Sequence, residues 1–326
     1  MKRLLLFIAL FFSISLSGQT ISDYQSYYAL AFTSKTKQPY VVLRKFIQNG
    51  KTHYLAVDPF NLSSRILEAR KLDIRTTGSF SDIASKLEHT PYIKSLKLVK
   101  ANDQAVQDAG ITHLNPTGKG VFLTIDLCPS QRPLDRVVFT EIMEEFGNVE
   151  SPVPLAISIT GVWIKKHPDD LAWLQKLIRR NKIAVLWINH TYNHRTSKKL
   201  PLTQNFMLEK GTNIPFEILE NEKLMIEQNL LPSVFFRFPG LVSDTALFNK
   251  VTSFGLIPVG SDAWLAKNQT PTEGSIVLIH ANGNEPYGIK KFIELIKSEK
   301  GNIKSQNWLL MDLREGLDKE EKTNND

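Results

Sequence analysis

The stretch VFLTIDLCPS, residues 121–130, begins the part of the chain that decides the fold. Its first five residues form an apolar run, which predicts a buried strand. Apolar residues then recur at helical spacing from 134 to 146, and Gly147 follows as a helix stop. This alternation of strand and helix continues to residue 311, and it predicts a parallel sheet that is either open or closed into a barrel.

The same signals predict the remaining elements of this part. Short apolar runs mark the strands, and Pro168 at a first helical turn and Ser243 or Asp244 as a cap mark two of the helices. Strands are predicted at 155–159, 183–188, 234–236, 256–259, 276–279 and 308–311, and helices at 168–178, 218–226, 246–254 and 289–298.

Residues 19–115 predict a small α+β region that precedes the alternation. Asn49-Gly50 separates two apolar runs within 40–58, and this dipeptide is a strong hairpin signal because both turn positions need a positive φ. The region ends at a connector rich in Pro and Gly, so we expect a barrel over 116–313 and a charged tail over 314–326. Short helices are expected at 63–69, 81–88 and 103–109.

The first 18 residues have the build of a secretory signal peptide, with a basic start followed by an apolar run and small residues. The apolar run of about 13 residues is shorter than the roughly 20 that span a bilayer. We therefore expect an exported protein, periplasmic or secreted, without a stable membrane anchor.

The composition is that of a globular protein, with 42% hydrophobic and 22% charged residues, which excludes disordered and collagen-like chains. Cys128 is the single cysteine, so an intramolecular disulfide and a cysteine-rich zinc cluster are excluded. The net charge of +7 is spread along the chain rather than concentrated, which argues against a nucleic-acid partner.

Titratable residues follow five of the predicted strands at the points where they end. In α/β barrels functional side chains gather at the ends of strands, so this regular placement predicts a site. The residues are Asp126, the pair His190 and His194, Arg237, Asp262 and His280.

His190 and His194 are the first candidates for metal ligands. Their spacing of four puts both imidazoles on one face of a helical turn. With Asp126 nearby, two imidazoles and one carboxylate suit Zn²⁺ or another borderline transition ion. The alternative is a pair of structural or surface histidines.

The other residues suggest acid–base roles. Asp126 is either a metal ligand or the base, and a bidentate contact from Arg237 would hold it ionised. His280 is a candidate general acid that Asp262 would orient. The alternatives are a solvated ion pair for Arg237 and a satisfied core histidine for His280. Trp264 and Leu278 are expected as pocket walls, and Cys128, between an apolar strand and Pro129, as a buried residue rather than a nucleophile.

Five short motifs in this order resemble those of the polysaccharide deacetylase family, also called the NodB-homology domain or carbohydrate esterase family 4. The resemblance covers residues 121–283, and it implies a distorted (β/α) barrel that binds a divalent metal. Family enzymes remove acetyl groups from N-acetylglucosamine-type sugars or from acetylated xylan. The motifs are Thr124-Ile125-Asp126-Leu127, His190-Thr191-Tyr192-Asn193-His194, Arg237-Phe238-Pro239-Gly240, Asp262 with Trp264, and Leu278-Ile279-His280.

The chain departs from the family pattern at two positions. Leu127 stands where the family has its second aspartate, which joins the two histidines on the metal, and Gly240 stands where it has a tyrosine. Asp126 could therefore enter the metal shell, the metal could bind through two histidines alone, or catalysis could be lost. Some members that resemble this chain carry Asp-x-Cys in the first motif, as Asp126-Leu127-Cys128 does here, which favours a functioning branch.

Together with the predicted signal peptide, the resemblance implies an exported, metal-dependent deacetylase that removes N-acetyl groups, in preference to O-acetyl groups, from an acetylated polysaccharide. Zn²⁺ is the expected metal, with Co²⁺ or Mn²⁺ as alternatives. Backbone N–H groups near Pro239 and Gly240 would stabilise the oxyanion. Two other functions stay open: a catalytically impaired glycan-binding relative, and a different metal-dependent amide hydrolase.

Overall fold

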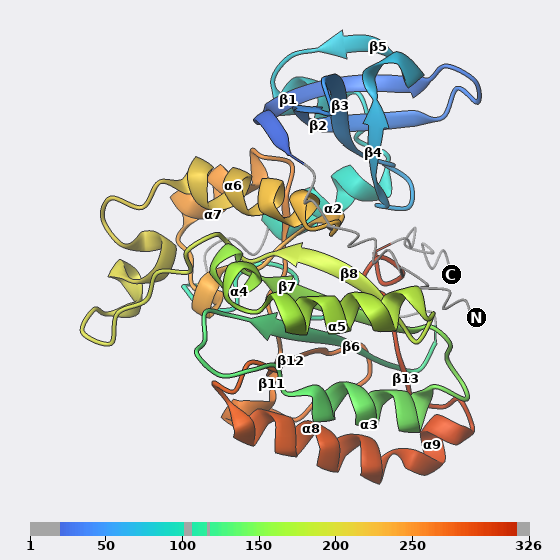
Figure 1. Ribbon diagram of the computed structural model, residues 1–326, viewed down its shortest axis with the longest axis vertical. Helices are drawn as coiled ribbons and strands as arrows, with labels where there is room; N and C mark the ends of the chain where they lie inside the picture. The colour runs from blue at the N-terminus through green and yellow to red at the C-terminus, as the bar shows by residue number, and fades with distance from the viewer. Residues whose placement is uncertain (1–19, 101–105, 116–117, 318–326) are drawn as a thin grey trace, which may run out of the picture.

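The computed structural model describes residues 20–100, 106–115 and 118–317 (Figure 1). The predicted signal peptide lies outside the described residues, as do residues 318–326 of the predicted tail. Of the helix predicted at 103–109, only 106–109 are described, and these residues are not helical.

The N-terminal region is built on a five-stranded antiparallel sheet with the strand order β4-β3-β2-β1-β5. The predicted hairpin is confirmed: Asn49 and Gly50 join its strands with φ values of 51° and 72°. The strands are β1 (Ile21–Thr33), β2 (Pro39–Gln48), β3 (Lys51–Val57), β4 (Ser64–Glu68) and β5 (Leu72–Thr77).

Two short helices complete this region. The predicted helix near 81–88 is present as α1 (Phe80–Ser85), which begins at a capping box made by Ser79 and Asp82. The helix predicted at 63–69 is wrong, because this segment is β4, whose backbone pairs with β3 along its whole length. Tertiary pairing here overrides the local apolar spacing. The helix α2 (Pro91–Lys100) was not predicted.

The second sheet is parallel throughout, and its strand order is β10-β9-β8-β7-β6-β12-β11, with β13 (Leu309–Leu310) also paired to β6. It confirms the predicted α/β fold, a curled, incomplete (β/α) barrel. The strands are β6 (Gly120–Leu127), β7 (Val153–Ile159), β8 (Ile183–Asn189), β9 (Pro232–Phe236), β10 (Ile257–Pro258), β11 (Ala263–Trp264) and β12 (Ile276–His280).

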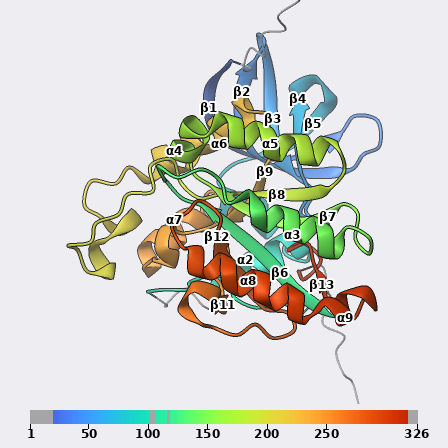
Figure 2. The same cartoon turned by 60° about the horizontal axis from the view of Figure 1, so that its bottom comes forward.

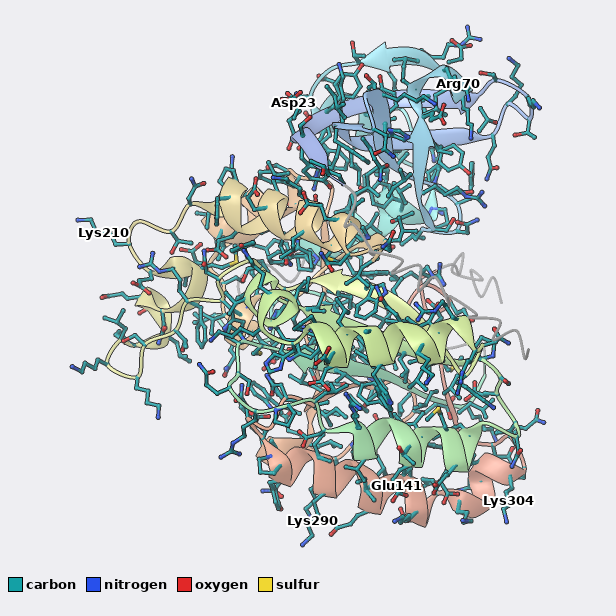
Figure 3. The ribbon with its side chains drawn as sticks, viewed as in Figure 1. Asp23, Arg70, Glu141, Lys210, Lys290 and Lys304 are labelled. Carbon is teal, nitrogen blue, oxygen red and sulfur yellow. The ribbon has the colours of Figure 1, made fainter. Side chains whose placement is uncertain are left out.

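Helices cover the outer face of this sheet. Figure 2 shows α3 and α8 in front of β6, and the apolar residues of α3, α5 and α8 form one buried cluster with the strands. Figure 3 shows the charged side chains of Lys290 on α8 and Lys304 on α9 at the outer edge of the molecule. The helices are α3 (Arg136–Phe146), α4 (Gly161–Lys166), α5 (Pro168–Arg179), α6 (Ile214–Glu227), α7 (Thr245–Thr252), α8 (Pro286–Ser298) and α9 (Lys300–Lys304).

The segment 106–115 crosses the gap that the sheet leaves between β10 and β11. Gln107 forms a bridge with Val242, Ile111 with Val259 beside β10, and His113 with Ser275 before β12. The two edges of the barrel are therefore joined by a segment that comes from outside the strand–helix alternation. Within the described residues, no helix has the length and apolar character that crossing a membrane requires.

The N-terminal sheet packs on the α6 and α7 side of the barrel (Figure 1). Val41, Leu43 and Val57 from this sheet share a buried cluster with Phe248 and Val251 of α7. One hydrophobic core thus runs from the antiparallel sheet into the barrel.

Candidate metal and acid–base site

The exits of β6, β8, β9 and β12 bring together most of the predicted site residues. Asp126 is the register partner of His280, since β6 and β12 are neighbours in the sheet. His190 follows β8, and Arg237 follows β9 with its backbone N–H bonded to the Asn189 carbonyl, 3.0 Å away. The convergence expected from parallel strand ends is therefore present.

Three side chains at this edge form a compact donor cluster. One ligand atom each from Cys128, His190 and His194 lies within 4.8 Å of the other two. Cys128 Sγ is 3.4 Å from His190 Nε2. The Nε2 atom of His194 is buried and makes no hydrogen bond within the described residues. A thiolate and two imidazoles are donors that suit a borderline transition metal, so the residues present fit a divalent ion.

His190 is held by a second contact behind the cluster. Its Nδ1 donates to the backbone carbonyl of Arg237 at 2.8 Å, because a carbonyl can only accept. This bond fixes the tautomer and leaves Nε2 free to face Cys128. Metal-bound histidines commonly have their other nitrogen fixed in this way.

Cys128 belongs to the site, a role that its position in the sequence did not suggest. Successive side chains of a strand point to opposite faces, so Asp126 and Cys128 share one face while Leu127 takes the other. Leu127 is 0% exposed and packs in the cluster with Ile125 and Ile159. Burial raises the pKa of the Cys128 thiol, but His194, His280 and His190 together lower it well below its usual range.

Asp126 lies beside this cluster. Its Oδ2 is 3.6 Å from His190 Nε2, and its buried Oδ1 has no hydrogen-bond partner within the described residues. Burial raises the pKa of this carboxyl, but the charge of Arg237 outweighs it together with smaller contributions from His190 and His280, and the net pKa is lowered.

Arg237 acts on Asp126 at a distance. The predicted bidentate contact is not formed, because none of the three guanidinium nitrogens has a hydrogen-bond partner among the described residues. The side chain is nevertheless 0% exposed. Its charge is thus buried and available to the carboxylate, but it is not neutralised by a direct ion pair.

His280 pairs with a residue that the sequence did not single out. Its Nδ1 lies 2.8 Å from Glu285 Oε2, an ion-pair contact whose angle is outside hydrogen-bond geometry. The same oxygen accepts a 2.9 Å hydrogen bond from Trp264 Nε1. Burial lowers the pKa of His280, but Cys128, Glu285 and Asp126 raise it well above its usual value.

Asp262 does not orient His280, which corrects the sequence-based expectation. It precedes β11, and its Oδ1 accepts from the backbone N–H of Ile276 at the first residue of β12. His280 is the last residue of that strand, roughly 13 Å further along at about 3.3 Å per residue. Asp262 Oδ2 instead lies 2.7 Å from His113 Nδ1 in the segment 106–115.

Trp264 and Leu278, the two residues expected as pocket walls, do not both face the site. Trp264 packs against the imidazole of His280 with ring centroids 5.7 Å apart. Leu278 is fully buried in the cluster of Trp264 and Leu241, so it supports the indole from behind.

Gly240 follows the buried Pro239 and has a structural reason to be glycine. Its φ is 62°, and an added Cβ would come within 2.4 Å of the Phe206 ring. The same ring lies edge-on to His194 with centroids 5.9 Å apart. The phenyl group of Phe206 therefore occupies the space beside position 240 where the family pattern has a tyrosine side chain.

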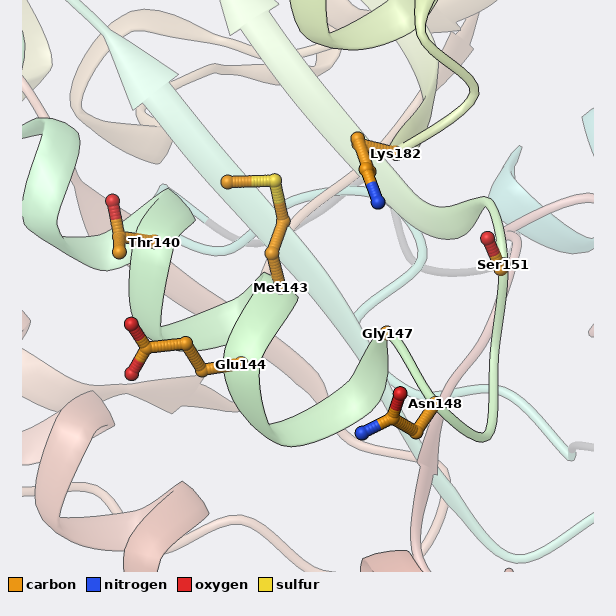
Figure 4. Close-up of a pocket in the computed structure, with 7 residues that line it drawn as sticks. All are labelled: Thr140, Met143, Glu144, Gly147, Asn148, Ser151 and Lys182. Atoms are coloured by element: carbon orange, nitrogen blue, oxygen red, sulfur yellow. The ribbon is translucent and has the colours of Figure 1, made fainter.

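Two surface hollows do not coincide with the donor cluster. One of about 290 Å³ lies at the C-terminal end of α3 (Figure 4). The other, of about 380 Å³, is lined by residues of the β8–α6 loop and α6, including Asn193 and Arg195, the neighbours of His194. Figure 4 shows Thr140, Met143, Glu144, Gly147, Asn148, Ser151 and Lys182 around the first hollow.

No protein-family model matches the chain. Among solved structures, a family 4 carbohydrate esterase from Bacillus anthracis is similar, with 16% identity, 68% of this chain and 90% of that chain covered, and a TM-score of 0.47. A family 4 pseudoenzyme from the same organism has 18% identity, coverages of 65% and 69%, and a TM-score of 0.44. The chitin deacetylase of Colletotrichum lindemuthianum has 16% identity, coverages of 64% and 92%, and a TM-score of 0.42.

Proposed function

We propose that this protein is a metal-dependent deacetylase that acts on an acetylated polysaccharide. The observation that carries the proposal is the donor cluster of Cys128, His190 and His194 beside a buried carboxylate and a histidine paired with a glutamate. These are the parts that hydrolysis of an amide or ester requires: a metal site, a base and an acid.

Cys128, His190 and His194 would hold the metal. A thiolate with two imidazoles favours Zn²⁺ over Mn²⁺, with Co²⁺ as a close substitute. When bound, the ion supplies Lewis-acid polarisation of the acetyl carbonyl and of the attacking water. Cys128 then takes the ligand position that a leucine at 127 leaves vacant, and Asp126 is available for another role.

Asp126 accepts the proton of the attacking water. Its lowered pKa keeps it ionised at neutral pH, and its unpartnered Oδ1 offers a lone pair to that water. His280 has a raised pKa, so it is protonated at the same pH and donates to the departing nitrogen. Two groups whose pKa values are pushed apart in this way divide the base and acid roles. The products are acetate and a free amino sugar.

The location and the polymer are part of the proposal. The signal-like residues 1–18 support export to the periplasm or the exterior. A protonated acid beside the reaction centre supports N-acetyl over O-acetyl substrates, because an amine is a poorer leaving group than an alcohol and needs the proton more. In this proposal residues 116–313 carry the chemistry, and residues 19–115 brace them.

The metal site is tested without any assay of activity. The purified chain should bind about one Zn²⁺, and His190→Ala or His194→Ala should lose it, while the matched variant His89→Ala, at a surface position, should retain it. Loaded with Co²⁺, the protein should show a thiolate-to-cobalt charge-transfer band that Cys128→Ser removes. Full metal content and an unchanged band in Cys128→Ser would refute the assigned ligand.

The reaction is tested by acetate release from N-acetylated and O-acetylated glycans with Zn²⁺ present. Asp126→Asn should retain the metal and lose about 10²–10⁴ in rate, the usual effect of removing a general base. Loss of the metal in this variant would make Asp126 a ligand instead. Glycan binding by the wild-type protein without acetate release from any glycan would establish the impaired binding protein and end the deacetylase proposal.

A further inference from the structure

We infer that Glu285 is the positioning residue for His280, a role that the sequence pattern gives to Asp262. The carboxylate of Glu285 fixes the ring so that Nδ1 faces the protein and Nε2 is left for the leaving group. This inference rests on the proposed deacetylase function, in which His280 is the acid.

The contact is built from three elements. His280 is the last residue of β12, Trp264 is the last residue of β11, and Glu285 lies in the loop that leads into α8. Glu285 Oε2 is 2.8 Å from His280 Nδ1 and 2.9 Å from Trp264 Nε1. One carboxylate oxygen thus serves both rings, and the indole N–H orients it toward the imidazole.

The loop that carries Glu285 is tied to the site. Asn282 donates from its side chain to the carbonyl of Cys128 at 2.8 Å, and its own carbonyl accepts from Ser130 at 2.7 Å. Gly283 donates to the Asp135 carboxylate at 2.8 Å. These bonds fix the β12–α8 loop against the exit of β6, so the position of Glu285 is set by the residues that surround the metal cluster.

Asp262 has a full set of partners elsewhere. Its two oxygens contact His113, the hydroxyl of Ser275 and the backbone N–H of Ile276. These contacts hold the segment 106–115 to the start of β12. Asp262 is therefore a structural residue at the opposite end of the strand from His280.

The imidazole of an isolated neutral histidine favours the Nε2–H tautomer, and a carboxylate on Nδ1 reverses that preference. In the acid form both ring nitrogens carry a proton, and Glu285 stabilises the Nδ1–H tautomer that remains once Nε2 has donated. Losing Glu285 should therefore disfavour that donation without displacing substrate. Enzymes lose large factors in rate when the partner of a catalytic histidine is replaced and the tautomer changes. The effect belongs to kcat, since the Nε2 proton is transferred only as the leaving group departs.

The test uses the full zinc-loaded chain and four variants. Glu285→Ala removes the acceptor, Glu285→Gln keeps an acceptor oxygen but removes the charge, and Asp262→Asn probes the rival residue. Glu294→Gln is the matched control, because this glutamate lies on the outer face of α8 and its ion pairs among the described residues are with Lys290 and Lys291. Each sample is checked for zinc content and circular dichroism before kcat, KM and the tautomer of His280 are measured. Long-range ¹H–¹⁵N NMR reports the tautomer, with His280→Gln to assign the signal.

We expect Glu285→Ala to lower kcat by about 10²-fold, within the range for general acid catalysis, with KM changed by no more than about twofold. At a pH where His280 is neutral, its signal in Glu285→Ala should move from the Nδ1–H to the Nε2–H pattern, and Glu285→Gln should fall between this variant and the wild type. A normal kcat in Glu285→Gln together with a loss in Asp262→Asn would overturn the assignment. If the wild type releases no acetate, the deacetylase proposal fails, and the NMR signal alone decides the Glu285 contact: an unchanged tautomer in Glu285→Ala refutes it.

Discussion

Two arginines of this protein are equally buried but differ in the hydrogen-bond partners of their guanidinium groups. Arg44 in β2 and Arg237 after β9 are both 0% exposed. Arg44 donates from Nε and Nη2 to the Glu222 carboxylate at 2.7 and 3.0 Å, and from Nη1 to the carbonyls of Leu43 and Phe254. Arg237 has no hydrogen-bond partner for any guanidinium nitrogen among the described residues.

In the proposed function, this difference separates a structural charge, Arg44, from a functional one, Arg237. A buried ion is tolerated when geometry satisfies it, and Arg44 with Glu222 meets that condition at the contact between the antiparallel sheet and α6. Tyr24 from β1 adds a 2.9 Å hydrogen bond to the same carboxylate. The charge of Arg237 is instead left to act on Asp126, whose pKa it lowers. Functional sites commonly keep such locally unfavourable arrangements.

Arg44→Met should have the largest effect on the free energy of unfolding. It leaves Glu222 as a buried carboxylate that has lost its counter-charge, and breaking one side of a buried pair usually destabilises by about 3–5 kcal/mol. Urea unfolding of the metal-free chain measures this change.

The double variant Arg44→Met/Glu222→Leu is the control for that experiment. With both charges gone, most of the lost stability should return, because two apolar side chains then fill the space of the pair. If Arg44→Met lowers the free energy of unfolding by less than about 1 kcal/mol, the Arg44–Glu222 pair contributes no more than a surface salt bridge does.

Arg237→Met should show the opposite pattern. Removing an unpartnered buried cation relieves its desolvation penalty but also takes the main counter-charge from the buried Asp126, so the free energy of unfolding should change by no more than about 1 kcal/mol. Acetate release should fall by about 10²-fold or more, because Asp126 loses the main charge that keeps it ionised and ready to accept a proton. A destabilisation above about 2 kcal/mol with normal turnover would show that Arg237, like Arg44, is a structural brace.

The sequence predicts the barrel well because its strands are buried on both faces. Such strands appear as continuous apolar runs, so 121–125, 155–159 and 276–279 could be recognised without knowing their partners. The strand β1 could not, because half of it is polar and its pairing with β2 and β5 is set by residues distant in the sequence. The local sequence pattern does not reveal which distant strand a segment pairs with.

The sequence predicts which strand ends carry the site residues. It does not predict which side chains at those ends point toward one another. His190, Arg237 and His280 could be found because each directly follows or ends a strand, and His194 because it lies four residues after His190. Cys128 was not assigned to the metal, although alternation along β6 places it on the face of Asp126.

Glu285 was missed because its contact depends on how the β12–α8 loop folds back. Asp262 was wrongly assigned to this role because it was taken as a residue that follows a strand, although it directly precedes β11. The sequence signal for Glu285 was its place just before Pro286, where a helix begins.

A third charged group, which is only half-buried, has the smallest expected effect of the three. Glu150 is half-buried, and its Oε2 accepts one hydrogen bond, from the backbone N–H of Leu310 at 3.1 Å. Burial raises its pKa to about 7, which the Leu310 bond opposes and Glu315 reinforces. The folded protein therefore binds more protons than the unfolded chain between pH ~4.3 and about 7, and stability falls as pH rises through that window.

Glu150→Gln retains an acceptor for Leu310 and removes the ionisation. The variant should match the wild type at pH 4 and exceed its free energy of unfolding by about 1 kcal/mol at pH 8, a value reduced from the full linkage because the carboxylate is partly solvated. Urea unfolding at both pH values measures the difference, and Glu141→Gln, on the surface of α3 where Lys297 pairs with it, is the control. An equal gain at both pH values would mean that folding leaves the pKa of Glu150 unshifted. Glu150 would then belong with Arg44, as a charge that its surroundings satisfy, and not with Arg237.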